Sequence, residues 1–322
     1  MDVLSEVLRA VRLTGAVFFD IGASQPWAIA SPDMSVVRER LMPDAGHIMP
    51  FHLMMAGSAW LDSCDPDAPM VPIETGDIIL LPRGNEHCLS SEPGNRILPK
   101  LDYYYRPTDQ QLPFRLSEIG GGGEPARLVC GYFGCDATPF NPLLDALPRT
   151  TIIRAASAPN GRASSFLDAA LAEGERTQPG SELVLAKLSE LMLVQALRSY
   201  IDALPENSEG WLSGLRDPLV GRVLLLLHGE PNRDWTLANL AREVGVSRSV
   251  LAERFTRLVH LPPMTYLARW RIQLAARALE QPSASISVVA AEVGYQSEAA
   301  FNRAFKKLVG LPPGQWRRAR AA

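Results

Sequence analysis

The sequence predicts a two-domain α+β protein, in which a β-rich N-terminal domain is joined through a helical segment to an all-α C-terminal domain. Three observations predict it. The chain has 322 residues, a length typical of about two domains. Short apolar runs broken by turn residues occupy roughly the first half of the chain, and helical apolar spacing follows. Near the C-terminus, a segment of about 50 residues occurs twice.

The composition places the chain among globular proteins, with 47% hydrophobic and 21% charged residues. Its net charge of -3 hides a strong asymmetry. Residues 217–322 hold 15 Lys and Arg against 8 Asp and Glu, which is +7, and the first 216 residues hold 17 against 27, which is -10. An acidic domain joined to a basic one indicates that the basic end binds a polyanion, most often nucleic acid.

The first residues are expected to form a short amphipathic helix, because Leu4, Val7, Leu8 and Val11 make an apolar stripe. They lack the basic start of a secretory signal. The apolar run Val223–Leu227 is far too short to cross a bilayer. We therefore expect a cytoplasmic protein without membrane contact, whose four cysteines are thiols rather than a disulfide framework.

Residues 1–160 are predicted to form a β-sandwich or barrel. The runs GAVFFDI, HLMMAGSAWL, GDIILLP and RLVCGYF have β-type composition and are separated by turn residues. The tract IGGGGEP, residues 119–125, cannot pack and is expected to be a mobile loop between strands.

Residues 161–204 are predicted to be a helical dimerisation segment of two helices, SSFLDAALAEGERT and SELVLAKLSELMLVQALRSYIDAL. In the second helix one apolar face is widened by further apolar residues, and such a helix usually has two packing partners. The face consists of Leu185, Leu188, Met192 and Leu197, and Leu191, Val194 and Ile201 widen it. The two partners would be its own β-domain and a second subunit of a homodimer, and burial within a single domain is the alternative.

A linker is predicted at residues 205–216, because Pro205 to Gly210 is polar and rich in turn residues. Asp217 followed by Pro218 then begins a helix, since Asp accepts from the first free amides and Pro at the first position loses no hydrogen bond. The C-terminal domain is therefore placed at residues 217–322.

The repeat lies in this basic domain. EVGVSRSVLAERFTRLVHLPPMTY, residues 243–266, recurs as EVGYQSEAAFNRAFKKLVGLPPGQW, residues 292–316. Each copy reads as a helix, a turn at Gly245 or Gly294, an N-capping Ser247 or Ser297, and a second helix that ends before Pro-Pro. This pattern predicts two helix-turn-helix units, with a generic helical repeat as the alternative.

The second helix of each copy has a polar outer face. Helical spacing turns Leu251, Phe255 and Leu258, and in the second copy Phe301, Phe305 and Leu308, toward the core. It leaves Ser249, Ala252, Glu253 and Thr256 outside in the first copy, and Glu298, Ala299, Asn302, Arg303 and Lys306 in the second. A continuous helix over residues 265–281 would separate the copies, so both could enter successive major grooves about 34 Å apart.

The span 217–318 resembles the DNA-binding domain of AraC/XylS-type bacterial transcription regulators, through WTLANLAREVGVSRS, RFTRLVHLPPMTYL, RWRIQLAARAL and VGYQSEAAFNRAFKKLVGLPPGQWR. The resemblance implies base contacts by Ser249, Ala252, Glu253, Ala299, Asn302 and Arg303. Arg248, Arg257, Glu298, Lys306 and Lys307 complete the expected DNA-binding set, the lysines on phosphates. His260 departs from the family's usual Gly, so that turn must accept a left-handed backbone or be distorted.

In the N-terminal half, the stretch Gly76–His87 fits G-x5-P-x-G-x2-H and so resembles the second motif of cupin barrels. That motif points His87 into the barrel mouth, where cupins hold a metal. His47 and His52 are candidate facing ligands, but the paired His and the Glu of the first cupin motif are absent. The expected ligand set is His47, His52, His87 and Cys88, and His52 and His87 either bind one divalent metal such as zinc or only form hydrogen bonds.

The whole chain is thus similar to regulators in which a cupin-like sensor domain precedes the DNA-binding domain. This implies a transcription regulator that binds promoter DNA, responds to a small-molecule or redox effector, and contacts RNA polymerase if it is an activator. Cys88, Cys130 and Cys135 are redox candidates, with purely structural thiols as the alternative. Two other functions stay open, a metal-dependent cupin enzyme fused to a DNA-binding domain and an architectural DNA-binding protein.

Overall fold

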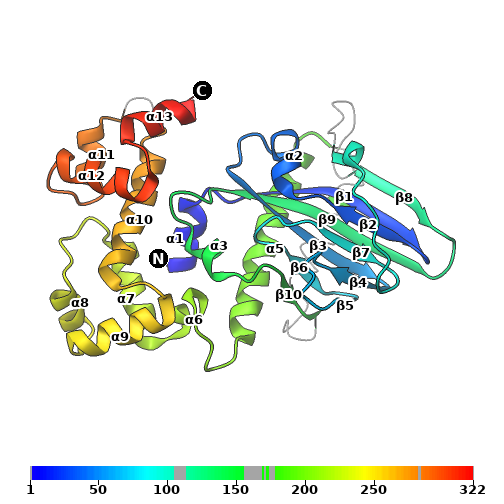
Figure 1. The fold of residues 1–322 in the computed structure, drawn as a ribbon, viewed down its shortest axis with the longest axis horizontal. Helices are drawn as coiled ribbons and strands as arrows, with labels where there is room; N and C mark the ends of the chain where they lie inside the picture. The colour runs from blue at the N-terminus through cyan, green and yellow to red at the C-terminus, as the bar shows by residue number, and fades with distance from the viewer. Residues whose placement is uncertain are drawn as a thin grey trace. The chain divides into compact units, whose positions relative to one another are not determined.

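The computed structural model describes residues 2–104, 114–155, 169, 172–173, 178–281 and 284–321. The chain divides into two compact units. The β-unit consists of Leu13–Cys135 and Leu147–Ala203, and the helical unit of Met1–Arg12, Asp136–Ala146 and Leu204–Ala322. Figure 1 shows the strands gathered in one unit and the C-terminal helices in the other.

The β-unit contains two sheets. The six-stranded sheet has the order β10-β6-β3-β9-β1-β8 and the four-stranded sheet the order β2-β7-β4-β5. The strands are β1 (Thr14–Ser24), β2 (Ala28–Ser31), β3 (His47–Ala56), β4 (Ser58–Asp62), β5 (Val71–Glu74), β6 (Ile78–Leu80), β7 (His87–Ser90), β8 (Phe114–Gly120), β9 (Pro125–Cys135) and β10 (Thr151–Ile153). Among the described residues, the helices of this unit include α2 (Met34–Leu41), the 3-10 helix η1 (Leu101–Tyr104) and α5 (Ser181–Ala203). All four predicted β-runs contribute to strands.

The long strands β1, β9 and β3 form the centre of the larger sheet. β9 pairs antiparallel with both β1 and β3, and β8 pairs parallel with β1. Phe51 of β3 and Phe133 of β9 stack with ring centroids 4.6 Å apart in the core. The predicted loop at residues 119–125 joins β8 to β9, where Gly120 has a φ of +120° that favours glycine.

Helix α5 packs on strand β1. At the contact, a Cβ on Gly15 would lie 2.6 Å from Ser189 Oγ, so only glycine allows this approach. The predicted inner residues Leu185, Met192 and Leu197 are buried, as expected for one face. The opposite face leaves Leu183, Val184 and Leu191 exposed. The first predicted helix of the segment 161–204 lies almost wholly outside the described residues.

The helical unit contains α1 (Val3–Ala10), α3 (Pro142–Ala146), α6 (Trp211–Arg216), α7 (Pro218–Gly229), α8 (Leu237–Glu243), α9 (Arg248–Val259), α10 (Pro263–Ala278), α11 (Ile286–Glu292), α12 (Glu298–Val309) and α13 (Pro313–Ala321). Helices α8–α9 and α11–α12 are the two predicted helix-turn-helix units. Asp217 caps α7, and Ser247 and Ser297 cap α9 and α12 by accepting from backbone amides, as predicted. Helix α10 connects the two units.

Both second helices end in a left-handed residue. Gly310 has φ +87°, and His260 at the equivalent place has φ +58°. In each case the backbone N–H donates to the carbonyl four residues earlier, Lys306 or Thr256. The turn therefore keeps its geometry and His260 accepts the strained conformation, which is the first of the two expected outcomes.

The unit boundaries correct the predicted domain limits. The expected linker at 205–216 is too long, because Trp211 of α6 is buried and its Nε1 donates to the hydroxyl of Tyr266 at 2.9 Å. Residues 2–12 and 136–146, assigned by the sequence to the sensor domain, pack with the C-terminal helices instead. Buried apolar side chains on α1 and α3 explain this, since α1 contacts α7 and α10 and α3 contacts α6.

In the part of the chain that the structure describes, no helix has the length and apolar character needed to cross a membrane.

Candidate functional site

The recognition helices α9 and α12 each bury one apolar face. Leu251 and Phe255 of α9 and Phe301 and Phe305 of α12 are fully buried. Leu258 is also buried, whereas Leu308 is only half-buried. This anchoring turns the remaining side chains of both helices to the surface.

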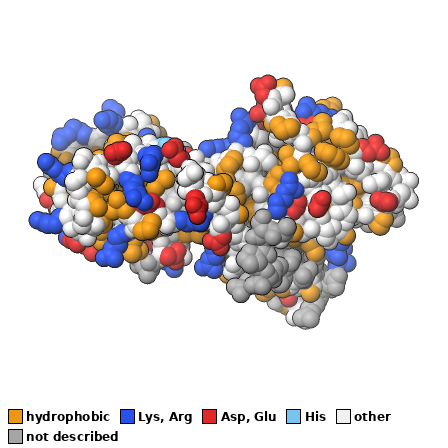
Figure 2. All heavy atoms as spheres, turned by 90° about the horizontal axis from the view of Figure 1, so that it is seen from below, with side chains coloured by type: hydrophobic (Ala, Val, Ile, Leu, Met, Phe, Trp, Pro, Cys, Tyr) orange, Lys and Arg blue, Asp and Glu red, His pale blue; other side chains and the backbone are white. Residues whose placement is uncertain are grey.

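All eleven predicted DNA-binding residues lie at the surface of these two helices. Ala252 and Asn302 are half-buried, and Arg248, Ser249, Glu253, Arg257, Glu298, Ala299, Arg303, Lys306 and Lys307 are exposed. The structure thus brings the predicted set onto two helix faces of one unit, and Figure 2 shows Lys and Arg side chains spread over that unit.

Five cations of this set have no acidic partner in the part of the chain that the structure describes. Among the described residues, no ion pair involves Arg248, Arg257, Arg303, Lys306 or Lys307. Arg254 differs from them, because its guanidinium donates to Asp217 at 2.6 and 2.9 Å. Five cationic side chains are therefore available to phosphates.

Lys307 has a different neighbourhood from Lys306. It lines a pocket of about 310 Å³ together with Pro139, Phe140 and Arg269. The side chain of Lys307 is thus placed toward the 136–146 segment, whose packing the sequence alone did not indicate.

A second group of functional side chains lies in the β-unit. His52 of β3 and His87 of β7 are buried, and their Nε2 atoms are 2.7 Å apart. The other ring nitrogen of His52, Nδ1, lies 2.7 Å from Cys130 Sγ on β9. His87 Nδ1 lies 2.8 Å from the carbonyl oxygen of Asn85. The four groups form one chain of hydrogen bonds.

The bond to Asn85 determines which group donates and which accepts in each of these hydrogen bonds. A carbonyl only accepts, so His87 Nδ1 carries the proton and donates to Asn85. The Nε2 of a neutral His87 then accepts from His52 Nε2, which leaves His52 Nδ1 to accept from the Cys130 thiol. Burial lowers the pKa of His52 well below its usual value and that of His87 to about 4, so both rings are neutral at pH 7. Burial raises the pKa of Cys130, which keeps its proton.

His47 and Cys88 do not join this group. His47 Nε2 donates to the carbonyl of Pro82 at 2.6 Å. Cys88 follows His87 in β7, and neighbouring residues of a strand point to opposite faces, so its side chain points away from His52. Its Sγ lies 3.6 Å from the carbonyl oxygen of Asn95. Of the four predicted ligand residues, the structure thus brings His52 and His87 together with Cys130 and leaves His47 and Cys88 apart. The alternation of Cys130 with Leu128 and Tyr132 was the available signal.

The histidine pair does not fit a metal as it is arranged. Zinc ligands lie about 2.0–2.1 Å from the metal at tetrahedral angles, which puts two nitrogens about 3.3 Å apart. The observed 2.7 Å is a hydrogen-bond distance, and the two nitrogens of His52 face different partners. Within the described ranges, no three His, Cys, Asp or Glu side chains are grouped so as to hold a metal ion.

A small cavity of about 20 Å³ adjoins this chain of hydrogen bonds. It is lined by Phe19, Ile21, Ile29, Ala30, Ser31, His52, Tyr104, Leu116, Cys130 and Tyr132. Its lining comes from both sheets, and Ser31, His52, Tyr104, Cys130 and Tyr132 are the residues in it that carry a polar group. That volume accommodates about one water molecule, so a larger molecule would require the sheets to part.

Two family models match the chain. The one described as Cupin matches residues 2–202, and the one described as Helix-turn-helix domain matches residues 240–319. The first covers more than half of the chain and the second contains α9, α10, α11 and α12.

Relatives of similar length match from end to end. A putative AraC-like transcription regulator from Streptomyces lividans is 33% identical, over 99% of this chain and 98% of its own. The HTH-type transcriptional regulator MtrA of Neisseria gonorrhoeae is 28% identical, over 99% and 98%. A crystal structure of the DNA-binding domain of AdpA, a global transcriptional factor in complex with a target DNA, is 28% identical, with a TM-score of 0.31 and coverage of 32% and 92%. The chain therefore belongs to the AraC-like transcription regulators, with a cupin domain followed by a helix-turn-helix domain.

Proposed function

We propose that this regulator binds promoter DNA through α9 and α12 together, and that the β-unit senses the signal that controls binding. The observation that carries the first part is the pair of surface helices on a twice-repeated scaffold, with five cations that have no ion-pair partner among the described residues. Such cations release counterions from DNA when they contact phosphates. Exposed Ser249, Glu253 and Arg303 and half-buried Asn302 would supply base contacts.

Binding selection on randomised duplexes with the full chain tests this function. We expect a recovered site with two half-sites about one helical turn apart, and an affinity that falls steeply with salt. A variant in which Arg303 and Lys306 are both replaced by Ala should lose most of that affinity. The matched control replaces Arg83 and Lys187 of the β-unit, and an equal loss there would contradict the assignment.

The hydrogen-bonded Cys130–His52–His87 chain supports the sensing role. A buried polar chain of this kind is stable only while every member has its partner. A molecule that bonds to His52, or a modification of the Cys130 sulfur, would remove one partner and disturb β3, β7 and β9 together. The effector is thus either a small molecule that opens the cavity or an oxidant that reaches Cys130.

Two measurements separate these effectors. If the signal is redox, dilute hydrogen peroxide changes the DNA affinity of the wild-type chain but not that of Cys130→Ser, and the modified residue is found by mass spectrometry. If the signal is a small molecule, ligands that raise the melting temperature of the wild type no longer do so in His52→Phe. If neither substitution changes the response to peroxide or to ligands, the signal is sensed at another site of the protein.

A homodimer through α5 is supported by the exposed face that carries Leu183, Val184 and Leu191 on a helix already packed against β1. Leu191→Glu should give a monomer in sedimentation, whereas Val36→Glu, another exposed apolar residue of the β-unit, should not. A dimer that survives Leu191→Glu shows that this face has no partner subunit.

The regulator would act in the cytoplasm, contact RNA polymerase if it is an activator, and have no enzymatic activity. The mismatch between the histidine pair and metal geometry supports a sensor over the alternative of a metal-dependent enzyme. Metal analysis of the purified chain tests that alternative, because an enzyme of this type would carry one metal ion for each chain.

A further inference from the structure

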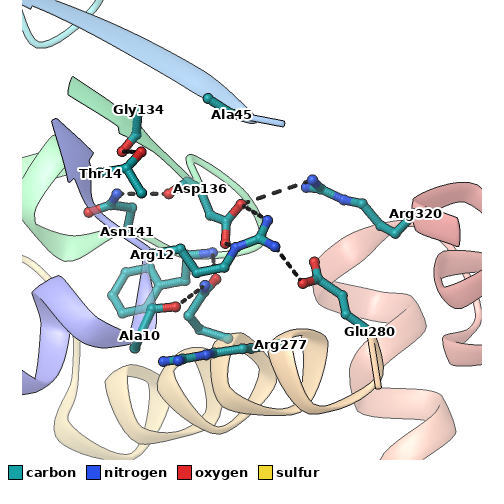
Figure 3. Close-up of polar contacts among 12 residues, drawn as sticks. Ala10, Arg12, Thr14, Ala45, Gly134, Asp136, Asn141, Arg277, Glu280 and Arg320 are labelled. Atoms are coloured by element: carbon teal, nitrogen blue, oxygen red, sulfur yellow. Dashed lines mark hydrogen bonds and ion pairs between the residues drawn. The ribbon is translucent and has the colours of Figure 1, made fainter. Parts of the chain in front are cut away.

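Two segments of the helical unit lie next to β-strands in the sequence. Residues 3–12 are separated from β1 by Leu13 alone, and residues 136–146 directly follow β9. We call these two segments the strand-exit clip. The amide of Asp136 donates to the carbonyl of Val11 at 2.8 Å, and the Arg12 guanidinium donates to both oxygens of Asp136 at 2.7 and 2.8 Å (Figure 3). The segments therefore form one piece.

The side chain of Gln273 connects this clip to the middle of α10. Gln273 is 1% exposed, and its Nε2 donates to the carbonyl of Ala10 at 3.3 Å. Its Oε1 accepts from the amide of Phe140 at 3.0 Å. The side-chain amide of Gln273 thus forms one hydrogen bond to the backbone of each segment of the clip. Loss of this side chain would remove the hydrogen-bond partner of both backbone groups, which is unfavourable for buried polar groups.

Further contacts hold the end of α10 and the second helix-turn-helix unit. Arg12 Nη1 donates to Glu280 Oε2 at 2.7 Å, and Arg277 donates to the carbonyl of Arg9. Arg320 of α13 lies 4.0 Å from Asp136 (Figure 3). The clip is therefore attached to α10 before, at and after its C-terminal end.

Helix α10 is shared by the two helix-turn-helix units. Its first half packs on the first unit, where Tyr266 contacts the ring of Phe255 with centroids 5.8 Å apart. Its second half, with Ile272 and Leu279, belongs to the core that also contains Phe301. Gln273 directly follows Ile272 near the start of the second half. The clip thus contacts α10 close to the place at which a bend would change the orientation of α9 relative to α12.

We propose that the strand-exit clip fixes the spacing at which α9 and α12 contact DNA, with Gln273 and Glu280 as its positioning residues. This inference rests on the proposed binding of both helices to one duplex. With the clip in place, nine of the eleven predicted DNA-binding side chains of α9 and α12 are exposed and the other two are half-buried, so the clip does not block them. A bend of about 10° over half of a 34 Å span moves one helix by about 3 Å, close to the rise of one base pair.

The strands beside the clip connect it to the cavity of the β-unit. Phe19 and Ile21 of β1 and Cys130 and Tyr132 of β9 line that cavity. The two strands are paired down to Thr14 and Gly134, immediately before the chain enters the clip. A signal that shifts β1 against β9 would therefore change the Arg12–Asp136 pair and, through it, α10.

The experiment compares spacings on DNA with the full chain. The probe is the duplex recovered by selection with the wild type, together with duplexes that have one base pair inserted or removed between the half-sites. The wild type should bind the altered duplexes about tenfold less tightly, the cost of roughly one lost base contact. Gln273→Ala and Glu280→Gln should bind all three duplexes with affinities within about threefold of one another, because α10 is free to adjust.

Gln281→Ala and Glu292→Gln are the matched controls, because both side chains are exposed and lie outside the clip. Circular dichroism at the binding temperature shows that each variant is folded, and Glu280→Gln decides the matter if Gln273→Ala unfolds. Wild-type spacing preference in both clip variants would overturn the proposal. If the wild type selects no DNA at all, the proposed function fails instead.

Discussion

The two helix-turn-helix units share a backbone and differ in their side chains. Helices α8 and α11 have 7 residues each, α9 and α12 have 12 each, and serine caps both recognition helices. In α9, Arg254 is tied to Asp217, and Ser249 Oγ lies 3.0 Å from Ser247 Oγ. In α12, Arg303 and Lys306 have no such partner among the described residues. The repeat thus preserves the scaffold, and we expect α12, which carries Asn302 and Arg303, to contribute more to base reading than α9, which carries Ser249 and Glu253.

The largest difference between the two helix-turn-helix units is expected at low pH, where the first unit should lose more stability than the second. His228, which packs on Tyr266 and Trp270 beside the first unit, is buried, and this burial lowers its pKa to about 3. The unfolded chain binds a proton near pH 6.5 and the folded chain does not, so stability is complete above pH 6.5 and falls as pH drops toward 3. At pH 4.5 the loss is about 3 kcal/mol.

The second unit, residues 286–322, contains no histidine. Hydrogen exchange at pH 7 and 4.5, corrected for intrinsic rates, should therefore show opening of α7 and α9 before α12. His228→Gln should remove the difference. Equal opening of both units in the wild type would show that His228 does not control the acid response.

Arg303→Ala should relax sequence preference at one base position by about 1–3 kcal/mol, more than Ser249→Ala does anywhere, because a guanidinium can bond to both O6 and N7 of guanine. Binding selection on randomised sites measures both variants. Arg303→Lys keeps the charge and loses the bidentate contact, so it should relax the same position. If Arg303→Lys behaves as wild type, the arginine contacts only phosphate.

Lys306→Ala should weaken binding to all sequences and reduce the slope of log affinity against log salt by about one. Lys307→Ala should do so less, because Lys307 faces a pocket lined by Pro139 and Phe140. Titrations at several salt concentrations check both. Equal slopes for the two variants would show that Lys307 is also on the phosphate backbone.

The smallest effect is expected at the C-caps. His260→Gly should stabilise the chain by up to about 1 kcal/mol, because glycine adopts the left-handed conformation without steric cost. Gly310→Ala is the matched change in the second unit, where a Cβ would meet nothing within 4 Å, so only the conformational cost of about 1 kcal/mol remains. Urea unfolding measures both, and a destabilising His260→Gly would mean that the imidazole makes a compensating contact.

Features set by neighbouring residues could be predicted from the sequence. The caps at Asp217, Ser247 and Ser297, the ends at Pro-Pro and the outward faces of α9 and α12 depend on interactions within about four residues. The β-runs and the motif ending at His87 are equally local. These features were sufficient to indicate the family, and they predict which surface would bind DNA.

Contacts between distant parts of the chain were decided only by the tertiary structure. His52 meets Cys130 across 78 positions, and Gln273 meets Ala10 across 263. Periodicity and capping rules relate residues only a few positions apart. Contacts between residues this distant form only when the strands pair and the core is buried. For the same reason α1 and α3 were assigned to the sensor domain, although their apolar faces are buried in the helical unit.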